Sequence, residues 1–283
     1  MQKRGQATLF IVAGVFLMIV FGLLTIVSSD VRELLLGWSK ERYVTYDYNE
    51  GLVRNTIASC ISDLSAAAIL QLAVHGGYLS VSPLPDLGES GAPSSLPYPP
   101  DAVPVLLDTS GFYTLSEQEM GSRICNYVYA YLGGCLDVAS LEDEGFAVSQ
   151  PVFDGDWSLV GRSCQTSFRG NSVVVKVDYP VLLSKDNYAF NTSNYAVDVR
   201  LGFKGVFEAS KTVLRDVFRD SVNNSYDLSD SCASLGGLRL ALAWLSDDEG
   251  VVSIVDPASA DAGYDTLAFR FGINGYNLTG SCN

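Results

Sequence analysis

The pattern of apolar positions opens with one long hydrophobic run at the start of the chain. No charged side chain lies between Arg4 and Asp30. The run from Ala7 to Val27 is long enough for a helix that crosses about 30 Å of hydrocarbon. We therefore predict a transmembrane helix over residues 6–29.

A second apolar pattern, with helical spacing, follows the hydrophobic run. Between Leu52 and Val74, apolar residues recur at steps of three and four, which indicates an amphipathic helix. Glycines at 76 and 77 follow the last turn and can supply a left-handed cap. The residues that carry this pattern are Val53, Ile57, Cys60, Ile61, Leu64, Ala68 and Leu72. We predict a helical stalk over residues 30–77, with a bend near Asn49.

The segment 78–104 has a different composition from its surroundings. It holds seven of the chain's ten prolines. Proline lacks a backbone donor and favours extended backbone, so we predict a loop that packs on the domain surface.

The remainder, residues 105–283, is predicted to form one extracellular head domain. A helix opens near Leu115, where Ser116 and Glu119 have capping-box spacing, and it ends at Gly133. Ser172–Tyr179 is rich in β-branched residues and is the clearest strand. Further predicted elements are a strand at Cys164–Phe168 joined to it by a turn, strands at Val181–Leu183, Ala196–Phe203, Leu238–Leu245 and Val251–Val255, and a helix at Gly205–Val222.

This order of elements predicts the fold class. Helices come first and strands dominate afterwards, which is typical of an α+β protein. We expect a long N-terminal transmembrane and stalk helix, followed by a mainly antiparallel β-sheet head with one or two packed helices.

Length and charge leave three interpretations of the N-terminus open. A removed signal peptide needs a shorter apolar core and a small-x-small cleavage site, and Ile26–Asp30 offers no such site. A simple membrane anchor fits the length, and Lys3 and Arg4 would hold the N-terminus in the cytoplasm. The third interpretation is cleavage in front of the helix, and it depends on the residues around Gly5.

The tetrapeptide Lys3-Arg4-Gly5-Gln6, placed directly before the apolar run, resembles the class III signal peptide of archaeal type IV pilins and related surface-filament subunits. In that family a prepilin-type peptidase cuts after the glycine. The resemblance implies a leader at residues 1–5, cleavage between Gly5 and Gln6, and a retained helix that packs against identical subunits or lies in membrane lipid. The residues implied for the membrane or filament core are Phe10, Ile11, Phe16, Leu17, Ile19, Phe21 and Leu24.

One position departs from the family pattern. Many pilins carry a glutamate five residues into the mature chain, where it helps to register incoming subunits, and this chain has Phe10 there. This departure favours the rival expectation of a membrane-anchored surface protein for adhesion or binding that does not polymerise. Both hypotheses place the head at the cell surface, as part of an extracellular filament or on a single-pass anchor.

The charge balance excludes one class of partner. Eighteen basic and 32 acidic side chains give a net charge of −14. Nucleic acid binding requires a basic surface to neutralise phosphates, so we expect no nucleic acid partner. The acidity suits a solvated outer surface.

Cysteines and sequons agree with export. Six cysteines follow the apolar run without a C-x-x-C pair, which allows up to three disulfides in an oxidising compartment. The favoured pairing joins Cys232 to Cys282, while Cys125 and Cys135 could bond to each other or to Cys60, and Cys164 completes the set. Possible glycosylation sites are Asn191, Asn223 and Asn277, each in an N-x-S/T sequon.

Little in the sequence points to catalysis. The one histidine, His75, stands beside two glycines at a helix end, and no nucleophile motif or phosphate-binding loop accompanies it. The acidic groups Glu142–Glu144, Asp154–Asp156 and Asp247–Glu249 lack the spacing of a calcium loop, and we interpret them as solvated turns. We expect a protein that is not an enzyme and that has no cofactor and no metal.

Overall fold

The computed structural model describes residues 50–88, 90–92, 94–151, 160–161, 163–221, 224–261 and 266–280. The chain divides into two units, Met1–Val53 and Arg54–Asn283, and the fold described here is that of the second. The predicted leader, its cleavage site and the predicted transmembrane helix, from Gly5 and Gln6 to Leu24, lie outside the described residues.

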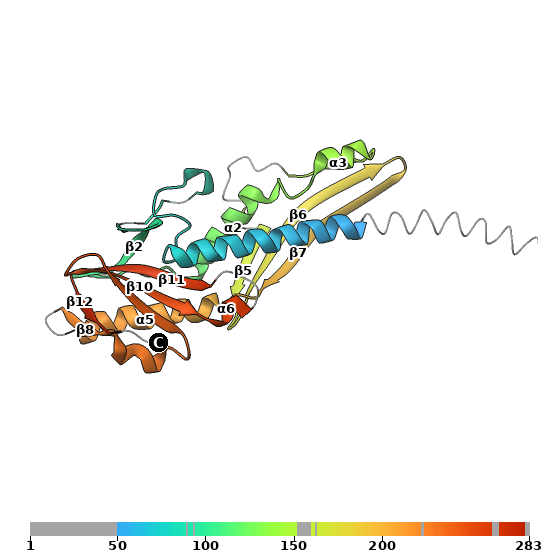
Figure 1. Ribbon diagram of the computed structural model, residues 1–283. Coiled ribbons are helices and arrows are strands. Elements are labelled where there is room, and N and C mark those ends of the chain that lie inside the picture. Colours follow the sequence, from blue (N-terminus) through green and yellow to red (C-terminus); the bar gives the residue numbers. More distant parts are fainter. Residues whose placement is uncertain are drawn as a thin grey trace, which may run out of the picture. The chain divides into compact units, whose positions relative to one another are not determined.

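A mixed α+β fold with one long apolar helix, Glu50–Val74, is the main feature of the described chain (Figure 1). Ile57, Ile61 and Leu72 are fully buried on one side of this helix, as its apolar periodicity predicts. The helix ends where Gly77 N–H bonds to the carbonyl of Leu72 at 2.6 Å. Gly76 and Gly77 have φ of 56° and 98°, so the predicted glycine cap is confirmed.

One sheet of the head has six strands. Its order is β1-β2-β11-β10-β9, with β3 paired to β2, and all pairs are antiparallel except the parallel pair β11–β2. The strands are β1 (Ser95–Tyr98), β2 (Asp101–Asp108), β3 (Gly111–Phe112), β9 (Arg239–Trp244), β10 (Glu249–Asp256) and β11 (Leu267–Asn274).

A second sheet of four antiparallel strands is built around one long hairpin. The strands are β4 (Ala147–Ser149), β5 (Cys164–Phe168), β6 (Val173–Lys185) and β7 (Tyr188–Val199). β6 is central, with β4 and β5 on one edge and β7 on the other. The predicted hairpin between β5 and β6 is confirmed. A small parallel pair completes the strands, β8 (Ser225–Asp227) with β12 (Asn277–Thr279).

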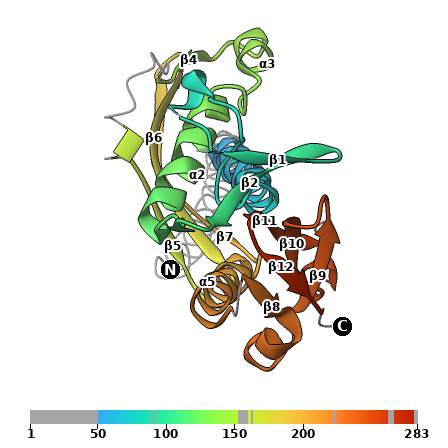
Figure 2. The same ribbon diagram turned by 90° about the vertical axis from the view of Figure 1, so that its left-hand side faces the viewer.

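Two longer helices pack on these sheets (Figure 2). They are α2 (Glu117–Leu132) and α5 (Phe203–Asp220), and the shorter helices are α3 (Val138–Asp143), α6 (Ala258–Asp261), η1 (Pro85–Leu87) and η2 (Leu228–Ser234). The capping box of α2 is confirmed, because Ser116 Oγ accepts from Glu119 N–H at 3.1 Å while the Glu119 carboxylate accepts from Ser116 N–H at 2.7 Å.

The core between α5 and the six-stranded sheet is aromatic. Phe207 and Phe269 lie 6.0 Å apart between ring centroids, and Phe203 lies 6.1 Å from Phe269. All three side chains are at most 3% exposed. This cluster joins the helix to β11 and fixes the position of α5.

Two sequence predictions were wrong in part. The proline-rich segment is not a loop throughout, because β1 and the start of β2 lie in it and bury Leu96 and Val103. Pro97 is tolerated there because β1 is an edge strand, where a missing N–H need not cost a ladder bond. The predicted strand Ala196–Phe203 stops at Val199, since Phe203 instead begins α5 and buries its ring.

Gly121 of α2 packs tightly against Thr166 of β5. A Cβ at position 121 would lie 2.0 Å from Thr166 Oγ1 and 3.3 Å from Thr166 Cβ. We expect Gly121→Ala to lower the free energy of unfolding by about 1–3 kcal/mol through this clash, as measured by urea denaturation. Thr166→Ala in the same chain should recover part of the loss.

The matched control for this prediction is Gly205→Ala in α5. A Cβ at position 205 meets no atom within 4 Å, so the substitution should be neutral or stabilise by up to about 1 kcal/mol. Equal destabilisation by the two alanines would show that contact with Thr166 is not the cause.

Candidate functional site: two disulfides around the second helix

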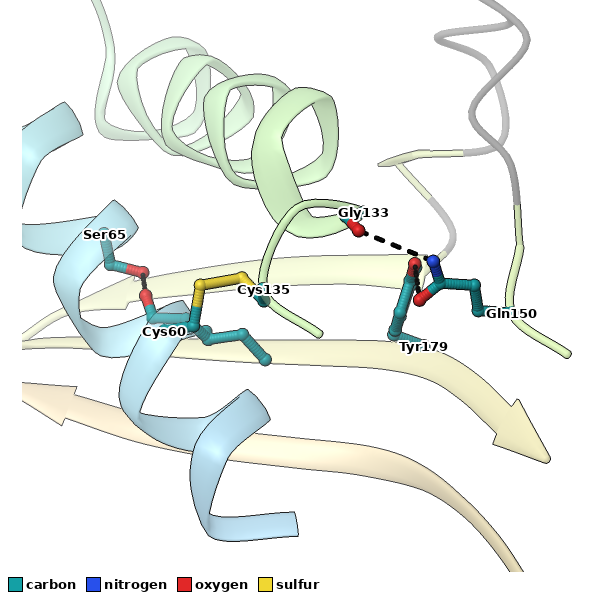
Figure 3. The surroundings of a disulfide bond; sticks show 7 residues. Cys60, Ser65, Gly133, Cys135, Gln150 and Tyr179 are labelled. Atoms are coloured by element: carbon teal, nitrogen blue, oxygen red, sulfur yellow. Dashed lines mark hydrogen bonds between the residues drawn. A yellow bond between two sulfur atoms is a disulfide. The ribbon is translucent and has the colours of Figure 1, made fainter. Parts of the chain in front are cut away.

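A disulfide between Cys60 and Cys135 joins the long helix Glu50–Val74 to the end of α2 (Figure 3). The two Cα atoms lie 5.7 Å apart, and 75 residues separate the cysteines in sequence. Cys135 reaches this position through a turn after α2, in which its N–H bonds to the carbonyl of Leu132 at 3.0 Å. The bond therefore fixes the middle of the long helix to the head.

A second disulfide, Cys125–Cys164, joins α2 to β5. Both cysteines are buried, at 3% and 5% exposure. α2 is thus cross-linked on one side to the long helix and on the other to the four-stranded sheet. The bond from Cys135 to Cys60 is one of the pairings that the sequence left open.

Cys232 also takes part in a disulfide. Its predicted partner, Cys282, lies outside the described residues. Every described cysteine is therefore oxidised. Disulfides form and persist in oxidising compartments.

Hydrogen bonds hold the turn that carries Cys135 (Figure 3). Gln150 Nε2 donates to the carbonyl of Gly133 at 3.4 Å, and the Tyr179 hydroxyl donates to Gln150 Oε1 at 3.3 Å and to the carbonyl of Pro151 at 3.2 Å. Burial, with smaller effects from Tyr129 and Tyr195, raises the pKa of Tyr179 to about 12. The phenol stays protonated at neutral pH and acts as a structural donor.

His75 is half-buried at the end of the long helix. Its Nδ1 atom is buried and has no hydrogen-bond partner in the described part of the chain. Burial lowers the pKa of His75, against a smaller opposing effect of Asp101. The position thus favours a neutral imidazole.

This shift predicts a pH dependence of stability. Because folding lowers the pKa, the stabilisation is complete above the ordinary histidine value of about 6.5 and is lost as the pH falls through the lower folded value. We expect the urea midpoint to fall between pH 7 and pH 5. His75→Gln should flatten this slope, since the chain has no other histidine. An unchanged slope in the variant would assign the effect to other groups.

The structure places the other predicted residues at separate positions. Asn191 on β7 and Asn277 on β12 are exposed, and Asn223 lies outside the described residues. Thr192 of the first sequon is 7% exposed, whereas Thr279 of the last is exposed. Glu142–Glu144 is solvated at the end of α3. The described residues among them form no common site.

The described residues of the head line open clefts, of which two are large. One, of about 750 Å³, is lined by α5, the end of β7 and the start of α6, with Asp198, Arg200 and Asp256 in its walls. The other, of about 800 Å³, lies between α2 and β5 beside the oxidised Cys125–Cys164 pair. Among the described residues, no three His, Cys, Asp or Glu side chains are grouped to hold a metal ion.

One described helix, Glu50–Val74, is long and apolar enough to cross a membrane by length and composition alone. A helix in the core of a water-soluble domain can have the same length and apolar composition. Ile57, Ile61 and Ile69 of this helix have no exposed surface. Ser65 is also buried, and its hydroxyl donates to the carbonyl of Ile61 at 2.6 Å. These contacts identify the helix as part of the head's core.

Sequence reasoning missed two features of this region. The pairing of Cys125 with Cys164 joins elements 39 residues apart, and no periodicity reveals such a contact. The close approach of α2 to β5 has a signal, a glycine inside an apolar helical pattern, which often marks tight packing. No family of known proteins, no curated protein and no solved structure matches this chain.

Proposed function

We propose that the protein is a structural subunit of an archaeal type IV pilus-like extracellular filament, assembled through its N-terminal hydrophobic helix. The observation that carries the proposal is Lys3-Arg4-Gly5-Gln6 directly before a run without charge up to Asp30. A prepilin-type peptidase would cut after Gly5, and the retained apolar helix would be buried among identical subunits, which removes its surface from water and lipid.

The helix Glu50–Val74 supports a role in which the head carries force along the filament. It belongs to the core of the head, and Cys60–Cys135 bonds it covalently to α2, which is bonded in turn to β5 through Cys125. Force that reaches this helix along the chain is therefore shared with the sheet through covalent bonds. Oxidised cysteines and exposed sequons at Asn191 and Asn277 support a location at the cell surface, with the N-terminus in the cytoplasm before processing.

The proposed role needs no catalysis, cofactor or metal. Tyr179 is held protonated, the described cysteines are oxidised, and His75 is set in a helix cap.

A second candidate function is a membrane-anchored surface protein for adhesion that does not polymerise. Phe10 favours it, because the glutamate that registers pilin subunits is missing. In this case the apolar helix stays in the membrane and the head alone makes contacts.

The experiment that separates the two functions uses Gly5→Val in the native host. Under the filament proposal, processing stops and the protein disappears from sheared filaments examined by negative-stain microscopy. Under the anchor alternative, surface display is unchanged by the substitution. Gly51→Ala is the control, since a Cβ at position 51 meets no atom within 4 Å, and it should leave both readouts intact.

A further inference from the structure

β7 is an edge strand of 12 residues. It pairs with β6 on one side, and no strand in the described part of the chain pairs with its other side. The β6–β7 hairpin extends beyond the strands of the six-stranded sheet (Figure 1). A row of backbone donors and acceptors therefore faces outward, and such an edge can pair with another chain.

Over most of its length the edge lacks the charges and prolines that usually prevent such pairing. Proteins also protect long edges with short strands and β-bulges; β7 has one charged residue, Asp198, and a register shift with β6 opposite Ser193. Asn187–Val197 contains no charged residue and no proline, in a chain whose net charge is −14. Two copies of so acidic a molecule repel one another, so contact between them costs least along an uncharged stretch.

The sequence of β7 is also nearly palindromic. On either side of the Thr192–Ser193 bond stand Asn191 and Asn194, then Phe190 and Tyr195, then Ala189 and Ala196. The exposure of these side chains follows the same symmetry. Both asparagines and both alanines are exposed, and Phe190 and Tyr195 are both buried. The register between β6 and β7 shifts opposite Ser193, because Asp178 pairs with Asn194 while Val181 pairs with Thr192. As a result, the buried residues of β7 have even numbers before Ser193 and odd numbers after it.

We propose that β7 is a self-complementary docking edge, and that two copies of this chain pair their β7 strands antiparallel about a two-fold axis at the Thr192–Ser193 bond. Such a contact is isologous, so each side chain must suit its symmetry partner. This register sets asparagine opposite asparagine, aromatic opposite aromatic and alanine opposite alanine, with buried positions on one face. Neutral amides and small side chains allow close approach of the two backbones.

The proposed contact has a defined direction. From Arg54 to Val74, the long helix runs along the β6–β7 hairpin (Figures 1 and 2). A two-fold axis across the strands reverses this direction, so the Arg54 ends of the two helices lie at opposite ends of the pair. The edge is therefore suited to copies that meet from opposite directions, on two surfaces or two filaments. This contact does not depend on the proposed polymerisation.

The sequon at Asn191 lies on the same edge. A glycan on this side chain would project where the second strand must lie, so glycosylation and pairing exclude each other. The test therefore uses protein made without glycosylation.

The test uses the full chain with one copy per lipid nanodisc, so that contacts through the hydrophobic N-terminus are prevented. Association of discs in pairs is measured by sedimentation velocity. In the proposed register, residue 191 of one copy lies opposite residue 194 of the other. The double variant Asn191→Lys with Asn194→Lys therefore places like charges opposite each other at two points. The double variant Asn191→Lys with Asn194→Glu places opposite charges at the same two points. We expect the first variant to associate at least about tenfold more weakly than the second, although both lose the sequon.

Ala147→Lys, on the exposed face of β4 in the same sheet, is the matched control and should associate like the unmodified chain. Circular dichroism confirms that each variant is folded. The proposal would be overturned if discs with the unmodified chain stayed monomeric at a concentration of about 100 μM. Equal association of the two double variants would overturn it as well.

A cross-link tests the register independently. A mixture of Asn191→Cys discs with Asn194→Cys discs should form an intermolecular disulfide, because directly opposite residues in an antiparallel pair have Cα atoms about 4.5–5.5 Å apart. A mixture of Asn187→Cys with Asn194→Cys should not, since these positions are out of register. Equal cross-linking of both mixtures would contradict the two-fold pairing.

Discussion

Replacing both Cys60 and Cys135 by serine is expected to lower the free energy of unfolding by about 4.5 kcal/mol. The loop that this bond closes spans 75 residues, and cross-linking a loop of that length removes about 15 cal/mol/K of entropy from the unfolded chain. Urea denaturation of the full chain, followed by circular dichroism, measures the loss. It is a large share of the total stability of an ordinary domain, about 5–15 kcal/mol.

The location of the loosened region distinguishes this bond from the second disulfide. Removing Cys60–Cys135 should raise amide hydrogen exchange in the first half of the helix Glu50–Val74. Replacement of Cys125 and Cys164, which close a 39-residue loop, should cost about 3.9 kcal/mol and raise exchange in α2 and β5. Unchanged exchange in the long helix after loss of Cys60–Cys135 would show that the bond does not hold it to the head.

Phe207→Ala is expected to lower the free energy of unfolding by about 3–5 kcal/mol. The ring is 3% exposed and lies 6.3 Å from Phe203 and 6.0 Å from Phe269 between centroids. Its removal leaves a cavity in the cluster that joins α5 to β11, and the rigid neighbours can fill it only in part. Urea denaturation monitored by circular dichroism should show a lower midpoint with a similar slope.

Phe218→Ala on the same helix is the matched control. Phe218 is 43% exposed and contacts Phe112, which is 41% exposed, at 5.8 Å between centroids. The substitution is the same and the helix is the same, so only burial differs. We expect a loss of no more than about 1 kcal/mol. A similar loss from both variants would mean that burial in the aromatic cluster does not set the effect, since the change to alanine raises helix propensity at both positions.

Local patterns predicted much of this fold. The three- and four-residue spacing between Leu52 and Val74 predicted a helix that spans Glu50–Val74, and Ser116 with Glu119 marked the start of α2 within two residues. The β-branched run Ser172–Tyr179 located β6, and the turn signal at Gly170–Asn171 located β5 in front of it. These signals are strong because the residues that determine each element lie within that element.

Features that depend on distant partners were harder to predict. The proline-rich segment contains β1 because Leu96 is buried beside Val105 and Val251, and no local signal reports those neighbours. Disulfide pairing could not be chosen from six cysteines, since it depends on which helix ends meet. The edge position of β7 could likewise not be predicted, since it depends on β6 being the one described strand that pairs with β7. The nearly palindromic order of residues in β7 is present in the sequence.

The proposed function requires that this chain is cut in front of its apolar helix and keeps that helix in a filament. Mass spectrometry of the N-terminus, on protein taken from the cell surface, tests this claim most directly. We expect a mature chain that begins at Gln6, with Met1–Gly5 removed. A surface protein that retains Met1 would contradict it.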